Sequence, residues 1–189
     1  WLSSRGLGDV YKRQIENYLK ALDIKKTYDK GWYSLGLAYK ENGDIENAMN
    51  SFKETVRLNS KYYKAHKSLG DLYIDTEEFD KAISSFQKAI DVKPNYSFAY
   101  HSLGITYAKI ENFEKSAEAL SKAVEIAPKE HLSWFHLAEA YNKLGDCESA
   151  KDAALESTDL KKNFGGGWFE LGIAEYCSGS GNKLSLIHI

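Results

Sequence analysis

The sequence predicts an all-α protein built as a solenoid of stacked antiparallel helix pairs. The first observation is a motif of eight residues, WYSLGLAY at 32–39, which returns in related form four more times, each time 34 residues further along. A fixed period of this length is typical of repeats that stack on one another. The second observation is composition: the chain has only two prolines and is rich in good helix formers.

Each repeat contains two helical patterns. In the first, apolar or small residues recur at i, i+3, i+4 and i+7, which is one face of an α-helix: Trp32, Leu35, Gly36 and Tyr39. The second pattern is clearest in residues 79–90 and is closed by Pro94, since proline cannot continue a helix. One helix pair cannot bury both of its apolar faces, so the pairs are expected to stack.

Glycines mark two features of the repeat. In Asn42-Gly43-Asp44, glycine suits the left-handed position after a helix, and Asp44 suits the N-cap of the next; Leu144-Gly145-Asp146 repeats this device. Other glycines lie in the middle of first helices, where we expect a neighbouring helix to approach closely. They are Gly36, Gly70, Gly104 and Gly172, with Ala48, Ala82 and Ala150 as the expected small neighbours and Phe52 and Phe86 as the bulky ones.

This pattern resembles the tetratricopeptide repeat, W-x2-L-G-x2-Y followed by a small residue, an aromatic residue, Ala and Pro. The resemblance implies a right-handed superhelical solenoid. Four full repeats are expected, at 29–62, 63–96, 97–130 and 131–164, between a lone second helix at 15–28 and a lone first helix at 165–182. Ser116 and Leu120 depart from the small and aromatic positions of the third repeat. Ala154 gives the fourth repeat little bulk, so we expect the C-terminal repeats to be the least stable.

Both ends of the chain fall outside the repeat pattern. Residues 1–14 and 183–189 resemble translated sequencing-adapter sequence, and we interpret them as non-native tails. The alternative is a native but unstructured terminus. On the first interpretation the chain is a fragment, and its localisation is not determined, with the cytoplasm slightly favoured. Cys147 and Cys177 are too few to predict a disulfide framework or a metal site.

The family resemblance implies a protein–protein interaction scaffold that holds a peptide or helix of a partner in a concave groove lined by the first helices. By register, the residues facing this groove, here called the predicted groove residues, are Lys30, Tyr33, Ser34, Leu37, Lys64, Lys67, Ser68, Asp71, Phe98, His101, Ser102, Ile105, Phe135, His136, Glu139, Phe169 and Ile173. Lysines dominate the first half of this set and apolar side chains the second. The aromatic residues suit either an apolar anchor site or packing between repeats, and the lysines either an acidic ligand or solvent.

Several functions are not supported. The two-carboxylate clamp of chaperone adaptors is absent, because Asp71 and Ser102 stand where it needs asparagine. His101, His136 and Glu139 are a conceivable metal or acid–base trio, but solvated polarity explains them equally well, so we expect no enzyme activity, metal or cofactor. A net charge of −2 argues against nucleic acid, and no run of apolar residues is long enough for membrane insertion.

Two alternatives stay open besides the scaffold. In the first alternative, the fragment is a substrate-recruiting module of a larger enzyme, such as a glycosyltransferase, whose catalytic domain is missing. In the second, which fits the charge of the chain less well, it is an RNA-binding helical repeat. Self-association through uncapped ends, with Trp168 and Leu171 exposed, is a further expectation.

Overall fold

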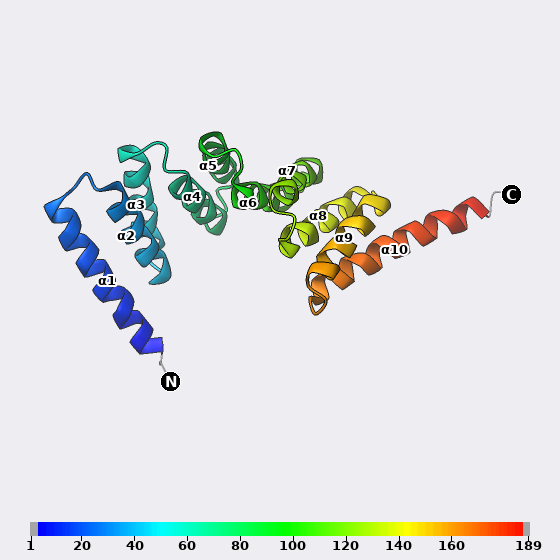
Figure 1. Ribbon diagram of the computed structural model, residues 1–189, viewed down its shortest axis with the longest axis horizontal. Helices are drawn as coiled ribbons and strands as arrows, with labels where there is room; N and C mark the ends of the chain where they lie inside the picture. Colours follow the sequence, from blue (N-terminus) through cyan, green and yellow to red (C-terminus); the bar gives the residue numbers. More distant parts are fainter. Residues whose placement is uncertain (1–3, 187–189) are drawn as a thin grey trace. The chain divides into compact units, whose positions relative to one another are not determined.

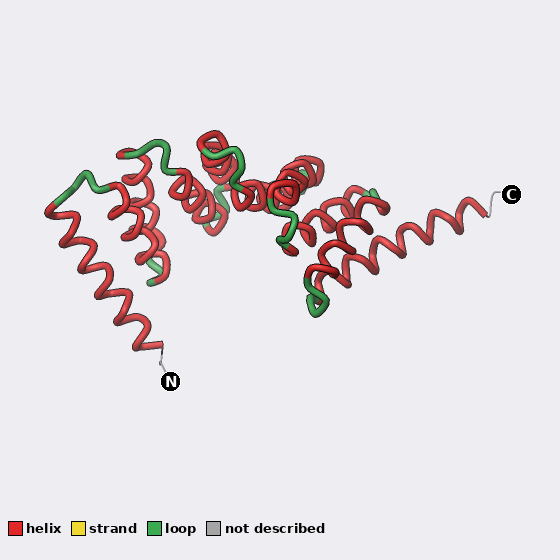
Figure 2. The backbone as a smooth tube through the Cα atoms, in the orientation of Figure 1, coloured by secondary structure: helices red, strands yellow, loops and turns green. Residues whose placement is uncertain are grey.

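The computed structural model describes residues 4–186, which form ten α-helices joined by short loops, with no strand among them (Figures 1 and 2). The first five helices are α1 Ser4–Ile24, α2 Asp29–Glu41, α3 Ile45–Leu58, α4 Tyr63–Asp75 and α5 Phe79–Val92. The other five are α6 Ser97–Lys109, α7 Phe113–Ile126, α8 His131–Leu144, α9 Cys147–Leu160 and α10 Gly165–Leu186. The predicted all-α helical repeat is confirmed.

The chain forms two compact units, Trp1–Pro94 and Asn95–Ile189. In the first unit, each of the helices α1 to α4 packs against the next one along the chain. In the second unit, α6 to α10 do the same, and α8 also contacts both α6 and α10. Consecutive helix pairs therefore stack within each unit, as the repeat pattern predicts.

The apolar helix faces predicted from the sequence form the core. In α5, the side chains of Ala82, Phe86 and Ala89 are fully buried. In the first unit a cluster joins Ala48 and Phe52 of α3 to leucines of α4, which ties one helix pair to the next. Burial of such apolar surface contributes about 25 cal/mol per Å² to folding.

The mid-helix glycines meet large side chains rather than small ones. A Cβ built on Gly36 would lie 2.6 Å from the Phe52 ring, and one on Gly70 would lie 2.5 Å from the Phe86 ring. The expectation of a close approach is confirmed at these positions. It is wrong at Gly172, where an added Cβ would have no neighbour within 4 Å.

The turns inside the helix pairs share one left-handed residue. Gly43 and Gly145 take this conformation, with φ of 80° and 76°, as predicted. Glu77 and Glu111 hold the corresponding positions in the other two repeats with φ of 59°, although side chains disfavour this region. The backbone of the repeat therefore imposes the turn even where glycine is missing.

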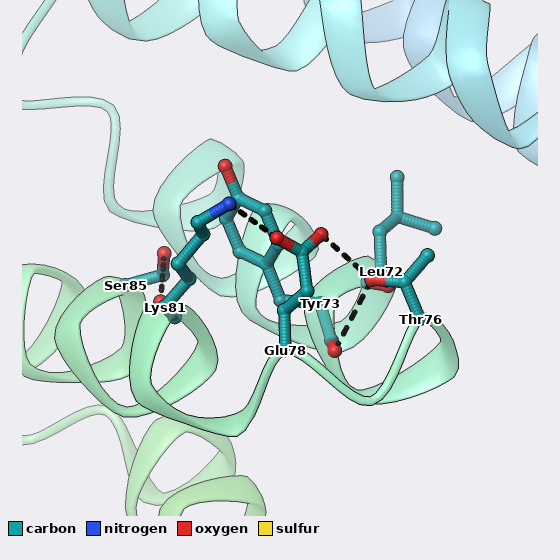
Figure 3. Close-up of polar contacts among 6 residues, drawn as sticks. All are labelled: Leu72, Tyr73, Thr76, Glu78, Lys81 and Ser85. Atoms are coloured by element: carbon teal, nitrogen blue, oxygen red, sulfur yellow. Dashed lines mark hydrogen bonds and ion pairs between the residues drawn. The ribbon is translucent and has the colours of Figure 1, made fainter.

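Side-chain hydrogen bonds stabilise the turns. Asp44 accepts a hydrogen bond from the backbone N–H of Asn47, and Asp146 accepts one from Ser149, so both act as the predicted N-caps. Between α4 and α5 there is a different arrangement (Figure 3). Glu78 accepts hydrogen bonds from Lys81 and, at 3.1 Å, from the Thr76 hydroxyl, which lowers the pKa of its carboxyl.

The start of four of the five first helices, α2, α4, α8 and α10, is fixed by one recurrent bond. Trp32, Trp134 and Trp168 each donate from Nε1 to the carbonyl oxygen six residues earlier, at 2.8 Å in all three cases. His66 occupies the same position, and its Nε2 lies 2.8 Å from the carbonyl oxygen of Ser60, again six residues earlier. Because a carbonyl only accepts, Nε2 carries the proton. His66 therefore replaces tryptophan in a structural role.

The structure adds a disulfide that the sequence analysis did not predict. Cys147, at the start of α9, is bonded to Cys177 of α10, with the two Cα atoms 5.7 Å apart. The expectation of no disulfide is wrong because stacking brings together two cysteines that lie 30 residues apart in the chain.

Helix extends into both stretches that were interpreted as tails. The helix α1 begins at Ser4 and α10 continues to Leu186, beyond residue 182. Residues 1–3 and 187–189 lie outside the described residues. The adapter origin of these stretches stays a prediction.

Candidate functional site: the groove-facing side chains

In the first unit, four predicted groove residues form a polar network between α2 and α4. The hydroxyl of Tyr33 is hydrogen-bonded with Ser68, and the ammonium group of Lys67 lies 2.8 Å from the carboxylate of Asp71. Ser68 itself is buried, and the side chains of Lys67 and Asp71 are 24% and 22% exposed. The four side chains are therefore bonded in two pairs inside the protein.

Burial dominates the electrostatics of the network. Desolvation raises the pKa of Asp71 above its usual range, although Lys67 and, at longer range, Lys40 oppose the shift. Desolvation also raises the pKa of Tyr33, with the bond to Ser68 acting in the opposite direction. Lys67 neutralises Asp71, so it is not available as an isolated positive charge for an acidic ligand.

The other predicted groove residues of the first unit are more accessible. Lys30 and Lys64 are exposed, Leu37 is 38% exposed and Ser34 is half-buried. Ser34 and Leu37 line a shallow cavity of about 130 Å³ beside α1. Among the predicted groove residues of this unit, these two lysines are the exposed cations.

In the second unit, a largely apolar cavity of about 200 Å³ lies between α6 and the start of α8. Phe98, 57% exposed, and Leu132, 38% exposed, form its apolar wall. His101 and Ser133 supply polar atoms, with His101 Nδ1 lying 2.7 Å from the Ser133 hydroxyl. Glu130 adds a carboxylate to the lining. We call this site the Phe98 cavity.

The structure brings the predicted trio of His101, His136 and Glu139 together. The rings of His101 and His136 are 5.3 Å apart between centroids, and His136 Nδ1 lies 3.2 Å from Glu139 Oε2. The bond from His136 lowers the pKa of Glu139 despite the opposing effect of burial. Over the part of the chain that the structure describes, no group of three or more His, Cys, Asp or Glu residues is placed to hold a metal ion.

The remaining aromatic and apolar groove residues divide into packed and exposed ones. Phe135 packs edge-on against Phe164, 5.1 Å between ring centroids, so it serves the contact between repeats. Phe169 is 68% exposed and Ile173 39% exposed, both on α10. In α6, Ser102 is buried and Ile105 half-buried.

Three members of the Phe98 cavity, Ser97, Glu130 and Ser133, were not predicted from the sequence. They lie at or just before the first turns of α6 and α8, outside the register used to choose groove residues. Their position around one cavity depends on how α8 packs against α6, which the repeat period does not give. Among the described residues, no helix combines the length and apolar character needed to cross a bilayer.

Stacked helix pairs with accessible side chains on their first helices define a helical-repeat protein of the kind that binds other proteins. Family comparisons identify the repeat. The tetratricopeptide repeat model matches residues 29–62, 99–130 and 132–164, which together exceed half of the chain, and a TPR repeat model matches residues 70–111. The chain belongs to the tetratricopeptide repeat family, which supports a protein-interaction scaffold. No curated protein sequence matches it significantly.

Several solved protein structures have a fold similar to that of this chain. The crystal structure of MamA is 25% identical, with a TM-score of 0.74 over 82% of this chain and 95% of that one. YrrB, described as a TPR protein with an unusual peptide-binding site, is 18% identical, with a TM-score of 0.77 over 87% of this chain and 85% of that one. MamA from Desulfovibrio magneticus RS-1 is 21% identical, with a TM-score of 0.69 over 82% and 96%.

Proposed function

We propose that this protein is a non-catalytic scaffold that binds a segment of another protein, and that the Phe98 cavity holds an apolar side chain of that segment. The observation that carries the proposal is the cavity itself. Its apolar wall includes Phe98, a large side chain that is 57% exposed. Exposed apolar surface of this kind tends to mark a protein interface.

The polar groups of the cavity suit a peptide backbone. His101 and Ser133 pair with each other at 2.7 Å, and Glu130 adds a carboxylate that can accept a hydrogen bond from a backbone N–H of a ligand. An extended segment with an apolar side chain pointing into the cavity would meet both requirements. The peptide-binding site named for YrrB supports this type of ligand.

In the first unit, the exposed lysines favour an acidic segment. Lys30 and Lys64 are exposed, whereas Lys67 is neutralised by Asp71. The attraction of exposed charges is screened by salt, so this contribution should weaken as ionic strength rises. Nothing in the described residues favours the enzyme-recruiting module over the scaffold.

Two leucines offer a matched test. Leu132 and Leu155 are each 38% exposed, but only Leu132 lines the Phe98 cavity. Peptides would be selected from a random displayed library on the parent protein, and their affinities would then be measured for Leu132→Ala, Phe98→Ala and Leu155→Ala. Because one apolar anchor contributes about 2 kcal/mol, we expect the two cavity variants to bind at least about tenfold more weakly. Equal affinity in Leu132→Ala and Leu155→Ala would show that the cavity is not the site.

A further inference from the structure

The helix α10 carries apolar side chains on two sides. Leu171 and Ala174, 7% and 0% exposed, belong to the side that packs on the rest of the second unit. The other side lies at the surface, where Trp168 is 52% exposed, Phe169 68% and Ile173 39%. A helix that is apolar all round is normally buried on all sides. The exposed side of α10 is therefore an exception that needs an explanation.

The exposed apolar residues of α10 form one continuous face. They recur at i, i+1, i+4, i+5 and i+8, a spacing that places them on one side of a helix. We call this set the α10 face; its members are Trp168, Phe169, Gly172, Ile173 and Tyr176. The two acidic residues of α10 are held elsewhere: Glu170 is buried and accepts a hydrogen bond from Asn142, and Glu175 lies 3.9 Å from Lys151. The face itself carries no charge.

The same position of earlier first helices is covered by another helix. Gly36 and Gly70 hold the position of Gly172 in the first two repeats, and the rings of Phe52 and Phe86 pack directly on them. At Gly172 an added Cβ would meet no described atom within 4 Å. The repeat therefore uses this position for contact between helices, and in α10 the contact surface is open.

The α10 face is complementary to a second copy of itself. Trp168 lies one turn before Gly172 and Tyr176 one turn after it. When two such helices lie antiparallel about a two-fold axis at Gly172, Trp168 of each helix faces Tyr176 of the other. The glycines then face each other, which lets the helix axes approach to the short end of the usual 8 to 10 Å range.

The area and the lack of charge both suit a homodimer. With about 150 to 250 Å² for each aromatic side chain, the exposed fractions given above and 78% for Tyr176 make the face roughly 500 Å² per copy, or about 1,000 Å² in a pair. This is the lower limit for a specific interface, so we expect a weak and reversible dimer. Homodimer interfaces are more apolar than other interfaces, and a face without charge has nothing with which to select a charged partner.

We infer that the α10 face is a dimer interface, in which α10 of one copy packs antiparallel on α10 of a second copy. Such a contact uses the same surface on both copies and leaves none of it free, so assembly stops at the dimer. The Phe98 cavity lies on α6 and α8 and takes no part in this contact. The dimer and the proposed peptide site are therefore independent, and either can fail without the other.

Two equally exposed apolar residues give a matched test. Ile173, 39% exposed, belongs to the α10 face, whereas Leu155, 38% exposed, lies on α9 outside it. The molar mass of the full chain would be measured by sedimentation equilibrium between about 1 μM and about 1 mM, where weak association is visible. The samples are the parent, Ile173→Glu and Leu155→Glu, with circular dichroism to verify that both variants stay helical.

The parent and Leu155→Glu should approach twice the monomer mass and not exceed it. Ile173→Glu should associate at least about a hundredfold more weakly, because each dimer would bury two unpaired carboxylates. A parent that stays monomeric, a mass that rises beyond the dimer, or equal association of the two variants would each overturn the inference. Phe98→Ala should dimerise like the parent, and loss of association in that variant would also overturn it.

Discussion

The packing of mid-helix glycines predicts opposite effects for the same substitution at two positions. Gly70 and Gly172 both lie inside first helices, α4 and α10. Replacing glycine with alanine in a helix normally stabilises it by about 1 kcal/mol. At Gly172 an added Cβ has no neighbour within 4 Å, so Gly172→Ala should show this gain in full.

At Gly70 the gain is outweighed by a clash. The added Cβ would lie 2.5 Å from Phe86 Cε1 and 2.7 Å from both Cδ1 and Cζ. The ring of Phe86 is 0% exposed, so it cannot move aside into solvent. Overpacking of this kind costs typically 1 to 3 kcal/mol. After the helical gain is subtracted, Gly70→Ala should destabilise the protein by up to about 2 kcal/mol.

The assay is urea denaturation followed by circular dichroism, with native-state hydrogen exchange to read the local stability of α4 and α10 separately. A local measurement is needed because repeat proteins do not always unfold in one step. We expect slower exchange in α10 for Gly172→Ala and faster exchange in α4 for Gly70→Ala. If both substitutions stabilise their helices equally, the close contact between Gly70 and Phe86 does not exist in solution.

Four further predictions concern the turns, the buried charge and the C-terminal helices. Glu77→Gly should stabilise the protein by about 0.5 kcal/mol, since relief of the left-handed strain exceeds the added chain entropy; a lower urea midpoint would contradict this. Because the pKa of Asp71 is raised in the folded protein, its contribution to the free energy of unfolding is fully present below pH 3.8 and is lost as the pH rises through the raised value. Asp71→Asn should therefore make the free energy of unfolding, measured by urea titrations at several pH values, depend less on pH; an unchanged pH dependence would contradict this. Reduction of the Cys147–Cys177 disulfide should make α9 and α10 the fastest-exchanging helices, whereas unchanged exchange would refute its stabilising role. Trp168, 52% exposed, should promote self-association, and sedimentation independent of concentration would argue against it.

The repeat period was sufficient to predict the helices and their pairing, because it reports which residues recur on one face. It also predicted the left-handed turns at Gly43 and Gly145, where glycine is visible. The same turns at Glu77 and Glu111 carry no sequence signal, since the surrounding backbone imposes them.

Features that depend on contacts between repeats could not be predicted from the repeat period. Ser116 and Leu120 were recognised as departures from the pattern, but a cavity of about 330 Å³ beside them depends on the distance between α6, α7 and α8. The disulfide likewise depends on how α10 packs against α9. Leu171 was expected to be exposed, which is wrong: it is 7% exposed because it joins the core cluster with Ala153 and Ala154.

The central claim, that the second unit binds a peptide at the Phe98 cavity, is tested most directly by mapping a selected peptide onto the protein with amide chemical shifts. The account predicts that the largest changes fall on Phe98, His101 and Ser133, and that residues around Leu155 change little. Changes concentrated on α9, with none at Phe98 or Ser133, would contradict it.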